Sequence, residues 1–356
     1  MMKKIVIATL FATIGATAGA QTVIEKYTAG GNPEGTFYYL PKTALRISVM
    51  VEKTQYTPGS LCMYADKFLR IKDVRQSASM SNKVISIKIT PFAMADTAKC
   101  YTVKYAGKSV GTNMQLSEEG CLLAVNTENT ATAATPAIFK PSPKPQLPSP
   151  NSYLSEEILS AGSTAKMAQL IAQDIYEIRD SKNQLTRGQA DFMPKDGEQL
   201  RLMLAQLTSQ ENAMVSMFTG TVERDTTEHI INICPMNELN KQVLFRLSKQ
   251  LGMVDSDDLS GTPYYIYIKN LRTIKLPEPD VKKKKVREEG IYVNVPEKIK
   301  VTINNGAQEL LSTELYAAQF GYTELISGDL FKRNTTKLQL FPTTGSIRKL
   351  EAEQPK

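Results

Sequence analysis

Few residues of this chain have the type and spacing that catalysis requires. The sequence contains a single histidine, His229, in a run where it alternates with Ile231 and Ile233. We therefore expect His229 on the same sheet face as those isoleucines. A Ser-His-Asp triad would have to be built around this one side chain, and no G-x-S-x-G motif accompanies it, which favours a structural role. One histidine also excludes a multi-histidine zinc site.

Paired carboxylates are the second candidate for chemistry. Glycoside hydrolysis uses two carboxyl groups about 5 to 10 Å apart across a cleft. Adjacent pairs occur at Glu118-Glu119, Glu156-Glu157 and Glu288-Glu289, all in loop-like or helix-start settings where solvated side chains are the default. The absence of tryptophan weakens a sugar-binding interpretation, although fifteen tyrosines can replace part of an aromatic platform.

A short acidic segment has the spacing of a calcium-binding loop. Asp255, Asp257 and Asp258 match the start of such a loop, but the glycine and the glutamate at its twelfth position are missing. A turn before a strand explains the segment equally well. The chain has no phosphate-binding loop and no dinucleotide fingerprint, so we expect neither a metal nor a cofactor.

Four cysteines, Cys62, Cys100, Cys121 and Cys234, allow three complete disulfide pairings. Cys100 and Cys121 begin neighbouring strand-like runs and are the pair that we predict. Isolated buried thiols are the alternative. No C-x-x-C motif is present, which disfavours a redox motif or a zinc ribbon.

Residues 1–20 have the pattern of a secretory signal peptide. Lys3 and Lys4 precede an apolar centre, and small residues lead to a predicted cleavage site between Ala20 and Gln21. No later segment approaches the ~20 apolar residues of a membrane span, and no cysteine follows the cleavage site. We expect a soluble, exported protein, periplasmic or associated with the cell surface, that is not a lipoprotein. Loss of the two lysines lowers the net charge from +7 to +5 (7 − 2), which indicates no nucleic-acid partner.

Hydrophobic periodicity divides the rest of the chain into segments. We predict an N-terminal β-rich domain with one short helix (21–130), a Pro-rich linker (131–150), a helical hairpin (151–220), a C-terminal β-sandwich-like domain (221–350) and a disordered tail (351–356). The predicted fold class is α+β: two mostly antiparallel, sandwich-like β domains with an intervening helical hairpin.

The hairpin has the clearest sequence signals. Ser163 is a candidate cap for the first helix, and Asp196 caps the second, where Gln199 completes a capping box. Gly220 follows the end of the second helix, where a residue with positive φ is favoured. Each helix has a single apolar stripe, so we expect the two to pack on each other and on a sheet. The methionines of the second helix are interpreted as core residues and not as a binding groove.

Short motifs are distributed along almost the whole mature chain. They are Tyr39-Leu40-Pro41-Lys42-Thr43, Tyr56-Thr57-Pro58-Gly59, Tyr64-Ala65-Asp66-Lys67, Glu177-Ile178-Arg179, Phe218-Thr219-Gly220, Gly290-Ile291-Tyr292-Val293-Asn294-Val295-Pro296, Ala318-Gln319-Phe320-Gly321 and Pro342-Thr343-Thr344-Gly345. Together they resemble an uncharacterised family, a domain of unknown function found in exported proteins of Bacteroides-type Gram-negative bacteria. In two places the chain differs from the family pattern. Asn294 lies in a stretch where Tyr-Arg-Ile-Pro is expected, and Arg70 replaces a usual glycine.

The resemblance implies export and no established activity. It also implies O-glycosylation at a signal of Asp, then Ser or Thr, then a small or apolar residue. Asp96-Thr97-Ala98 fits this signal, so Thr97 is the predicted glycosylation site, and Asp225-Thr226-Thr227 fits more loosely.

The function that we expect is non-catalytic binding or assembly in the bacterial envelope. The partner would be an envelope protein or a glycan, or a second copy in a homo-oligomer. The alternative is a glycan-active hydrolase or carbohydrate-binding protein that uses paired carboxylates and tyrosines. The arrangement of the carboxyl groups in the structure distinguishes these two hypotheses.

Overall fold

The computed structural model describes residues 22–26, 35–105, 113–131, 139–141, 148–194, 196–275, 290–328, 330–331 and 335–353. Its strands are β1 (Thr22–Lys26), β2 (Thr36–Thr57), β3 (Ser79–Tyr105), β4 (Met114–Leu116), β5 (Leu122–Val125), β6 (Thr221–Ile233), β7 (Leu239–Ser248), β8 (Gly252–Val254), β9 (Thr262–Asn270), β10 (Gly290–Asn304), β11 (Glu309–Ser327), β12 (Thr335–Leu340) and β13 (Ile347–Glu353). Its helices are α1 (Ala65–Leu69), α2 (Glu156–Leu159), α3 (Thr164–Arg187) and α4 (Gly197–Thr219), with 3₁₀ turns η1 (Cys62–Tyr64) and η2 (Pro150–Tyr153). The predicted signal peptide and its cleavage site, Ala20 and Gln21, lie outside the described residues.

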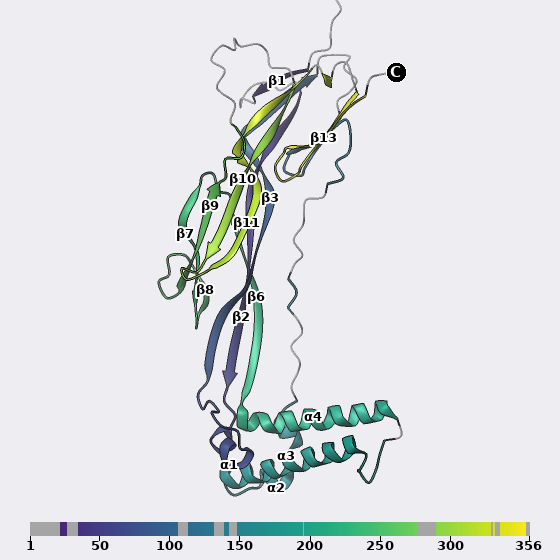
Figure 1. Ribbon diagram of the computed structural model, residues 1–356, viewed down its shortest axis with the longest axis vertical. Helices are drawn as coiled ribbons and strands as arrows, with labels where there is room; N and C mark the ends of the chain where they lie inside the picture. Colours follow the sequence, from purple (N-terminus) through teal and green to yellow (C-terminus); the bar gives the residue numbers. More distant parts are fainter. Residues whose placement is uncertain are drawn as a thin grey trace, which may run out of the picture.

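The strands form three sheets in which the neighbouring strands are antiparallel. Their orders are β1-β3-β2-β6, β11-β10-β9-β7-β8 and β13-β12-β5-β4. The predicted α+β class with mostly antiparallel sheets is confirmed. Figure 1 shows an elongated molecule in which β2, β3 and β6 run down to a helical layer at one end, while β13 lies near the other.

The largest core lies between the first two sheets. In β2, Leu45, Ile47 and Val49 are fully buried on one face, as the alternating pattern predicts. They pack against apolar residues of the second sheet, among them Phe245 and Ile299. At about 25 cal/mol for each Å² of apolar surface, such inward-facing positions are the main stabilising contribution in this part of the molecule.

A second core joins the ends of the long strands to the third sheet. Tyr38 and Leu40 of β2 pack with Leu122 of β5 and Leu338 of β12, and with Ile291 at the start of β10. β2, β10 and β11 therefore contribute to two successive cores. A strand of 22 residues, such as β2, is long enough for this role at about 3.3 Å per residue.

The cores do not follow the predicted division into domains 21–130 and 221–350. β6 pairs with β2 over its whole length, from Leu45 opposite Ile233 to Thr57 opposite Thr221. Both of these cores combine residues from before and after the helical hairpin. The pattern within a strand gives no information on which strand it pairs with. The segments predicted as domains along the sequence therefore differ from the units that pack together in space.

The helices form a third core at the end of the sheets. Ile171 and Ile175 of α3 pack with Met214 and Phe218 of α4, together with Leu61 beside η1 and other apolar residues of the short helices. The expectation that the hairpin packs on itself is confirmed, but packing on a sheet face is wrong. The short helices and turns cover the apolar stripes, and α3 and α4 lie across the strand direction (Figure 1).

The predicted helix ends are correct. The Ser163 side chain accepts a hydrogen bond from the Lys166 backbone N–H at 3.2 Å. The Asp196 carboxylate accepts one from the Gln199 N–H at 2.7 Å, and Gly220 ends α4 with a φ of 76°. Arg70 ends α1 with a left-handed φ of 59°, a conformation that glycine adopts at no steric cost.

The C-terminal tail is shorter than predicted. β13 extends to Glu353 and pairs with β12, so residues 351–353 belong to a strand and not to a disordered segment. Cross-strand hydrogen bonding orders these polar residues, although they have no apolar pattern of their own.

Candidate functional site

A buried polar joint connects the two cores that the sheets form. It consists of Thr43, Asn294, Gln319 and Thr344. The Gln319 side-chain amide accepts a hydrogen bond from the Thr43 N–H at 2.9 Å and donates one to the Thr43 carbonyl at 2.8 Å. The Thr43 hydroxyl accepts a hydrogen bond from the Ala318 N–H at 3.1 Å. The Asn294 side-chain amide donates hydrogen bonds to the carbonyl oxygens of Pro41 and Thr344, at 2.8 and 2.9 Å. These bonds supply partners for backbone groups that strand pairing leaves unpaired.

The polar joint forms where the strands change register. The β10–β11 pairing moves from Val295 opposite Tyr322 to Glu297 opposite Ala317. In this bulge, a Cβ on Gly321 would lie 1.8 Å from the Val295 carbonyl oxygen, so only glycine fits. The bulge lets β10 and β11 contribute to both cores.

A second joint connects the sheet to the helical layer. The Tyr56 hydroxyl donates hydrogen bonds to the carbonyls of Arg75 and Thr219, at 2.7 and 2.9 Å. A Cβ on Gly220 would lie 2.4 Å from the Thr57 carbonyl oxygen, and one on Gly59 would lie 2.2 Å from the Met217 carbonyl oxygen. The backbones therefore approach too closely for any side chain at these two positions.

Most of the motifs that carry the family resemblance lie at these two joints. Thr43, Asn294, Gln319 and Thr344 come from four different motifs and meet in the polar joint, whereas Tyr56, Gly59, Thr219 and Gly220 meet at the helical layer. We assign these motif residues to architecture and not to a reaction.

The predicted disulfide partners lie on opposite sides of one strand. Tyr39 of β2 pairs with Cys100 of β3 at one edge and bridges to Cys121 at the other. Neighbouring strands are about 4.8 Å apart, so the two Cα atoms are about 10 Å apart, beyond the ~7 Å limit for a disulfide. Both thiols are free and buried, which corrects the predicted Cys100–Cys121 pair. Burial raises the pKa of the Cys121 thiol to about 11.

His229 and Thr97 lie far from any shared cavity. His229 is part of β6, opposite Val49, and its Nε2 lies 3.3 Å from the Thr227 hydroxyl. Thr97 is exposed in the bulge of β3 between Ala95 and Cys100, and the Asp96 carboxylate beside it accepts a hydrogen bond from the Ala98 N–H at 3.1 Å.

The carboxylate pairs that the sequence suggested are not brought together. Glu156-Glu157 begins α2 in the helical layer, whereas Glu118-Glu119 lies in the turn between β4 and β5, in the same sheet as β13 at the other end (Figure 1). Glu288-Glu289 lies outside the described residues. Asp255 and Asp258 belong to a turn in which the Asp258 N–H donates to the Asp255 carbonyl at 3.2 Å. Among the described residues, no group of three or more His, Cys, Asp or Glu residues could hold a metal ion.

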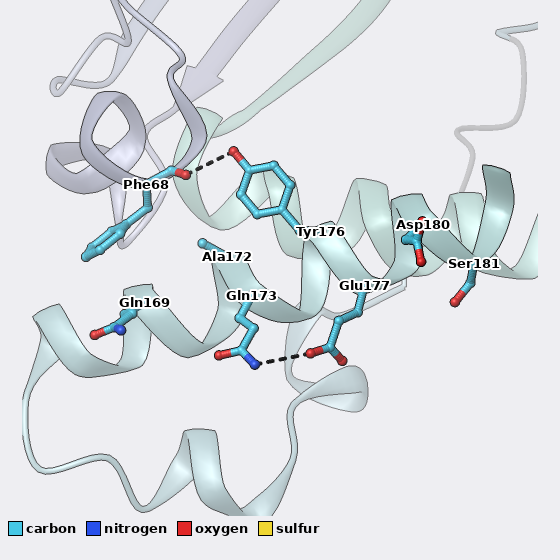
Figure 2. Close-up of a pocket in the computed structure, with 8 residues that line it drawn as sticks. All are labelled: Phe68, Gln169, Ala172, Gln173, Tyr176, Glu177, Asp180 and Ser181. Atoms are coloured by element: carbon cyan, nitrogen blue, oxygen red, sulfur yellow. Dashed lines mark hydrogen bonds between the residues drawn. The ribbon is translucent and has the colours of Figure 1, made fainter. Parts of the chain in front are cut away.

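An open groove in the helical layer is the candidate binding site. It has a volume of about 700 Å³ and is lined by Phe68 of α1 and by Gln169, Ala172, Gln173, Tyr176, Glu177, Asp180 and Ser181 of α3. Figure 2 shows the Tyr176 ring reaching toward α1, where its hydroxyl donates a hydrogen bond to the Phe68 carbonyl at 3.2 Å. Gln173 and Glu177 lie on the side of α3 away from this contact and are joined by a hydrogen bond of 3.2 Å.

The wall of the groove is acidic. Glu177 and Asp180 supply two carboxylates, and the lining contains no lysine or arginine. Burial, followed by the nearby charges of Glu177 and Glu157, raises the pKa of the Asp174 carboxyl. Glu211 of α4 pairs with Arg179 and Lys182 of α3 at 2.7 and 2.9 Å, which fixes the two helices relative to each other. The groove can thus accept hydrogen bonds from a cationic or N–H-rich group.

The sequence contained part of this site. Gln169, Gln173 and Glu177 form a polar stripe on α3 opposite its apolar face, which the helical period predicts. The contribution of Phe68 was not predictable, because it depends on the packing of α1 against α3. The two helices are about a hundred residues apart in the chain. No sequence signal links the two segments.

The fold and the two joints define an α+β protein in which a layer of helices ends an elongated, mostly antiparallel β structure. The chain belongs to the family described as a domain of unknown function (DUF4831), which covers residues 34–348. No curated protein and no solved structure matches the chain. Among the described helices, none combines the length and apolar character needed to cross a membrane.

Proposed function

We propose that this chain is an exported, non-catalytic binding or assembly protein of the bacterial envelope, and that its helical end binds another envelope protein. The acidic groove between α1 and α3 is the observation that carries the proposal. The groove combines two aromatic side chains, two amides and two carboxylates in one open surface. Its complement is a segment that presents a lysine or arginine.

Charge and shape favour this kind of partner. The aliphatic part of a Lys or Arg side chain fits against Phe68, Ala172 and Tyr176, while its charged end reaches Glu177 or Asp180. The two rings already attract cations: the Lys67 ammonium lies 5.1 Å from the Phe68 ring centroid and the Arg179 guanidinium 5.6 Å from that of Tyr176.

The tip of the hairpin carries further exposed apolar side chains. Phe192 is 90% exposed and Leu202 is 56% exposed. Large apolar side chains that remain in solvent at a projecting tip are typical of protein interaction sites. Charges of both signs surround them, including the Arg201–Glu198 ion pair of 2.6 Å, which favours a protein surface over an anionic membrane.

The dispersal of reactive groups favours binding over hydrolysis. His229 in β6, Glu156-Glu157 at the start of α2 and Glu118-Glu119 in the turn before β5 lie on different elements, and none of them lines the groove. The two carboxylates of the groove come from the same helix and line the same wall, whereas a glycosidase needs them on both sides of its substrate.

A pull-down with the mature chain, Gln21 onward, tests the proposal. The bait is incubated with envelope extract, and the retained proteins are identified by mass spectrometry. We expect one stoichiometric partner, which the variant E177K/D180K loses. The control E309K/E324K makes the same charge change at two exposed residues of β11 and should retain the partner.

Three results would contradict the proposal. They are the absence of any protein partner, retention of the partner by E177K/D180K, and a clean signal on a glycan array without a protein partner. Sedimentation of the pure protein at tens of micromolar separates self-association through the hairpin tip from binding to a different protein.

We also propose that Thr97 is O-glycosylated in its native host. The side chain is exposed on a bulge, where an enzyme has access, and it follows Asp96 in the signal that the family resemblance implies. Intact mass spectrometry of native material should exceed the mass of the bare mature chain, and T97A should remove the difference. A mass equal to that of the bare chain would contradict this proposal.

A further inference from the structure

A second hollow lies on the outer face of the β11-β10-β9-β7-β8 sheet, away from the helical layer. It has a volume of about 780 Å³ and is lined by residues of β7, β9 and β10 and of the segment that follows β9. The lining includes Tyr267, Lys269, Arg272, Lys300 and Thr302, and also Glu238, whose carboxylate accepts a hydrogen bond from the Asn270 N–H at 2.8 Å. The volume is within the range of about 300–1,000 Å³ that is usual for small-ligand sites.

A bulge in β7 accounts for the hollow. Leu239 pairs with Ile268 and Gln242 with Ile266, so β7 has one more residue than β9 over this stretch. Lys241, in the extra length, has a left-handed φ of 53°. Bulges of this kind bend a strand and redirect its side chains. Here the bulge lies beside the exposed face of β9.

The hollow contains an unfavourable pair of like charges. Lys269 and Lys300 are directly opposite each other in the β9–β10 pairing, and both side chains are exposed. Like charges in such positions repel each other, and Lys300 also lies opposite the carboxylate of Glu314 in the β10–β11 pairing, which offsets part of this repulsion. The next lysine on the same face of β10, Lys298, forms an ion pair of 2.6 Å with Glu314. Within the described part of the chain, no carboxylate lies within ion-pair distance of Lys269, Lys300 or Arg272.

A third cation is held beside this pair by a buried carboxylate. Glu297, 3% exposed, accepts hydrogen bonds from the N–H groups of Thr273 and Ile274 at 2.9 and 3.0 Å. The Arg272 N–H donates to the Asn270 side chain at 2.9 Å. The segment that carries Arg272 is therefore fixed on both sides, and the charge of Glu297 is used inside the protein. Glu238 is the carboxylate in the lining, so three cations and one carboxylate leave the hollow with a positive balance.

An aromatic ring and neutral polar groups complete the site. Tyr267 pairs with Thr302 on the same face, one position along from the lysine pair, and is half-buried. Asn240, Asn270 and Asn304 also line the hollow. Tyrosine rings provide flat surfaces for sugar rings, while amide and hydroxyl groups exchange hydrogen bonds with sugar hydroxyls.

We propose that this hollow binds an acidic oligosaccharide, with its carboxylate or sulfate between Lys269 and Lys300 and a sugar ring against Tyr267. Arg272 contacts a second acidic group on the same ligand. This site is independent of the groove between α1 and α3 and adds a glycan-binding activity to the proposed protein-binding function. An acidic peptide would form ion pairs with the lysines. It would not offer the sugar rings and hydroxyl groups that suit the tyrosine ring and the amide groups.

Calorimetric titration of the full mature chain with defined probes tests the proposal. The probes are tetragalacturonate, a chondroitin sulfate tetrasaccharide and uncharged maltotetraose, with polyglutamate as the peptide comparison. We expect one or both acidic saccharides to bind and maltotetraose not to bind. K269Q/K300Q should weaken binding at least tenfold, whereas K166Q/K249Q, which removes two charges at exposed positions elsewhere, should change it less than twofold.

Two further measurements separate the site from a merely structural role. Without ligand, K269Q/K300Q should melt close to the temperature of the parent, because the loss of the Lys269–Lys300 repulsion is offset by the loss of the attraction between Lys300 and Glu314. Y267A should weaken saccharide binding while the shift in melting temperature caused by inorganic sulfate is kept. Three results would overturn the proposal: no binding of either acidic saccharide, full binding by K269Q/K300Q, or equal binding of polyglutamate.

Discussion

At the scale of single residues, the buried polar side chains of this protein anchor backbone segments. Glu297 is the clearest case, because its carboxylate accepts bonds from three backbone N–H groups and from the Thr273 hydroxyl. Burial alone would raise the pKa of the Glu297 carboxyl, but the bonds from Thr273, Lys298 and Ile274 together hold that pKa below its usual value.

Substitution E297Q should lower the free energy of unfolding by about 2 kcal/mol at pH 7, since hydrogen bonds to a charged group contribute about 1.5–3 kcal/mol. A carboxyl whose pKa is lowered by folding stabilises the protein above its unfolded pKa of about 4.3 and loses that effect as the pH falls through the folded value. Urea unfolding should therefore show the difference at pH 7 and a smaller one below pH 4. The exposed E309Q is the control, and a pH-independent difference would refute this assignment.

The cysteines provide a second prediction at this scale. Alkylation under denaturing conditions without reductant should label all four, because Cys100 and Cys121 are held apart by β2. In the folded protein Cys121 should react slowly at pH 8, because it is buried and has a pKa of about 11. A mass lower by the two hydrogens of one disulfide, located to Cys100 and Cys121, would show that the strands separate.

At the scale of elements, close backbone contacts join the helices to the sheet. Gly220 combines a positive φ with a position where a Cβ would lie 2.4 Å from the Thr57 carbonyl oxygen. Gly188, at the end of α3, has a similar φ of 71° but no atom within 4 Å of that position. A substitution at Gly188 therefore introduces backbone strain alone, whereas a substitution at Gly220 introduces backbone strain and a steric clash.

We expect G188A to cost about 1 kcal/mol of stability, which is the strain of a left-handed alanine. G220A should cost at least about 3 kcal/mol, because the α4–β6 connection or the end of β2 must also move. Thermal unfolding of both variants measures the difference. Equal losses of stability in the two variants would mean that the backbone near Gly220 moves to make room for the methyl group at no cost in free energy.

At the scale of the whole molecule, the sheets join distant parts of the chain. Leu45, Ile47 and Val49 lose their cover if the residues after 220 are absent, because that cover is the second sheet. Each such side chain contributes about 1.5–3 kcal/mol when buried. The two sequence halves therefore do not have separate cores.

Expressed alone, residues 21–150 and residues 151–353 should each be unfolded or aggregate, whereas co-expression should restore a folded complex. Circular dichroism and thermal unfolding of each fragment test this prediction. A cooperative transition from either fragment alone would show that the predicted sequence domains are also folding domains.

The sequence predicted the elements better than their arrangement. Ser163, Asp196 and Gly220 have the predicted roles at helix ends, and the alternation from Leu45 to Val51 is the buried face of β2. The pairing of Cys100 with Cys121 was wrong because the pattern of each strand gives no information on which strand lies between them. The helical period accounts for the polar face of α3 that carries Gln169, Gln173 and Glu177, but the groove itself and its second wall had no signal in the sequence.

Local features follow from the sequence alone, because helix caps act over three or four residues and apolar periods define which face of an element is buried. Contacts between distant segments depend on how the whole chain folds. Asn294 donates to the carbonyl of Pro41, 253 residues away. The Lys269–Lys300 pair likewise arises from the register of two strands. Register is set by the packing of the whole sheet, and that packing has no signal in any short stretch of the chain.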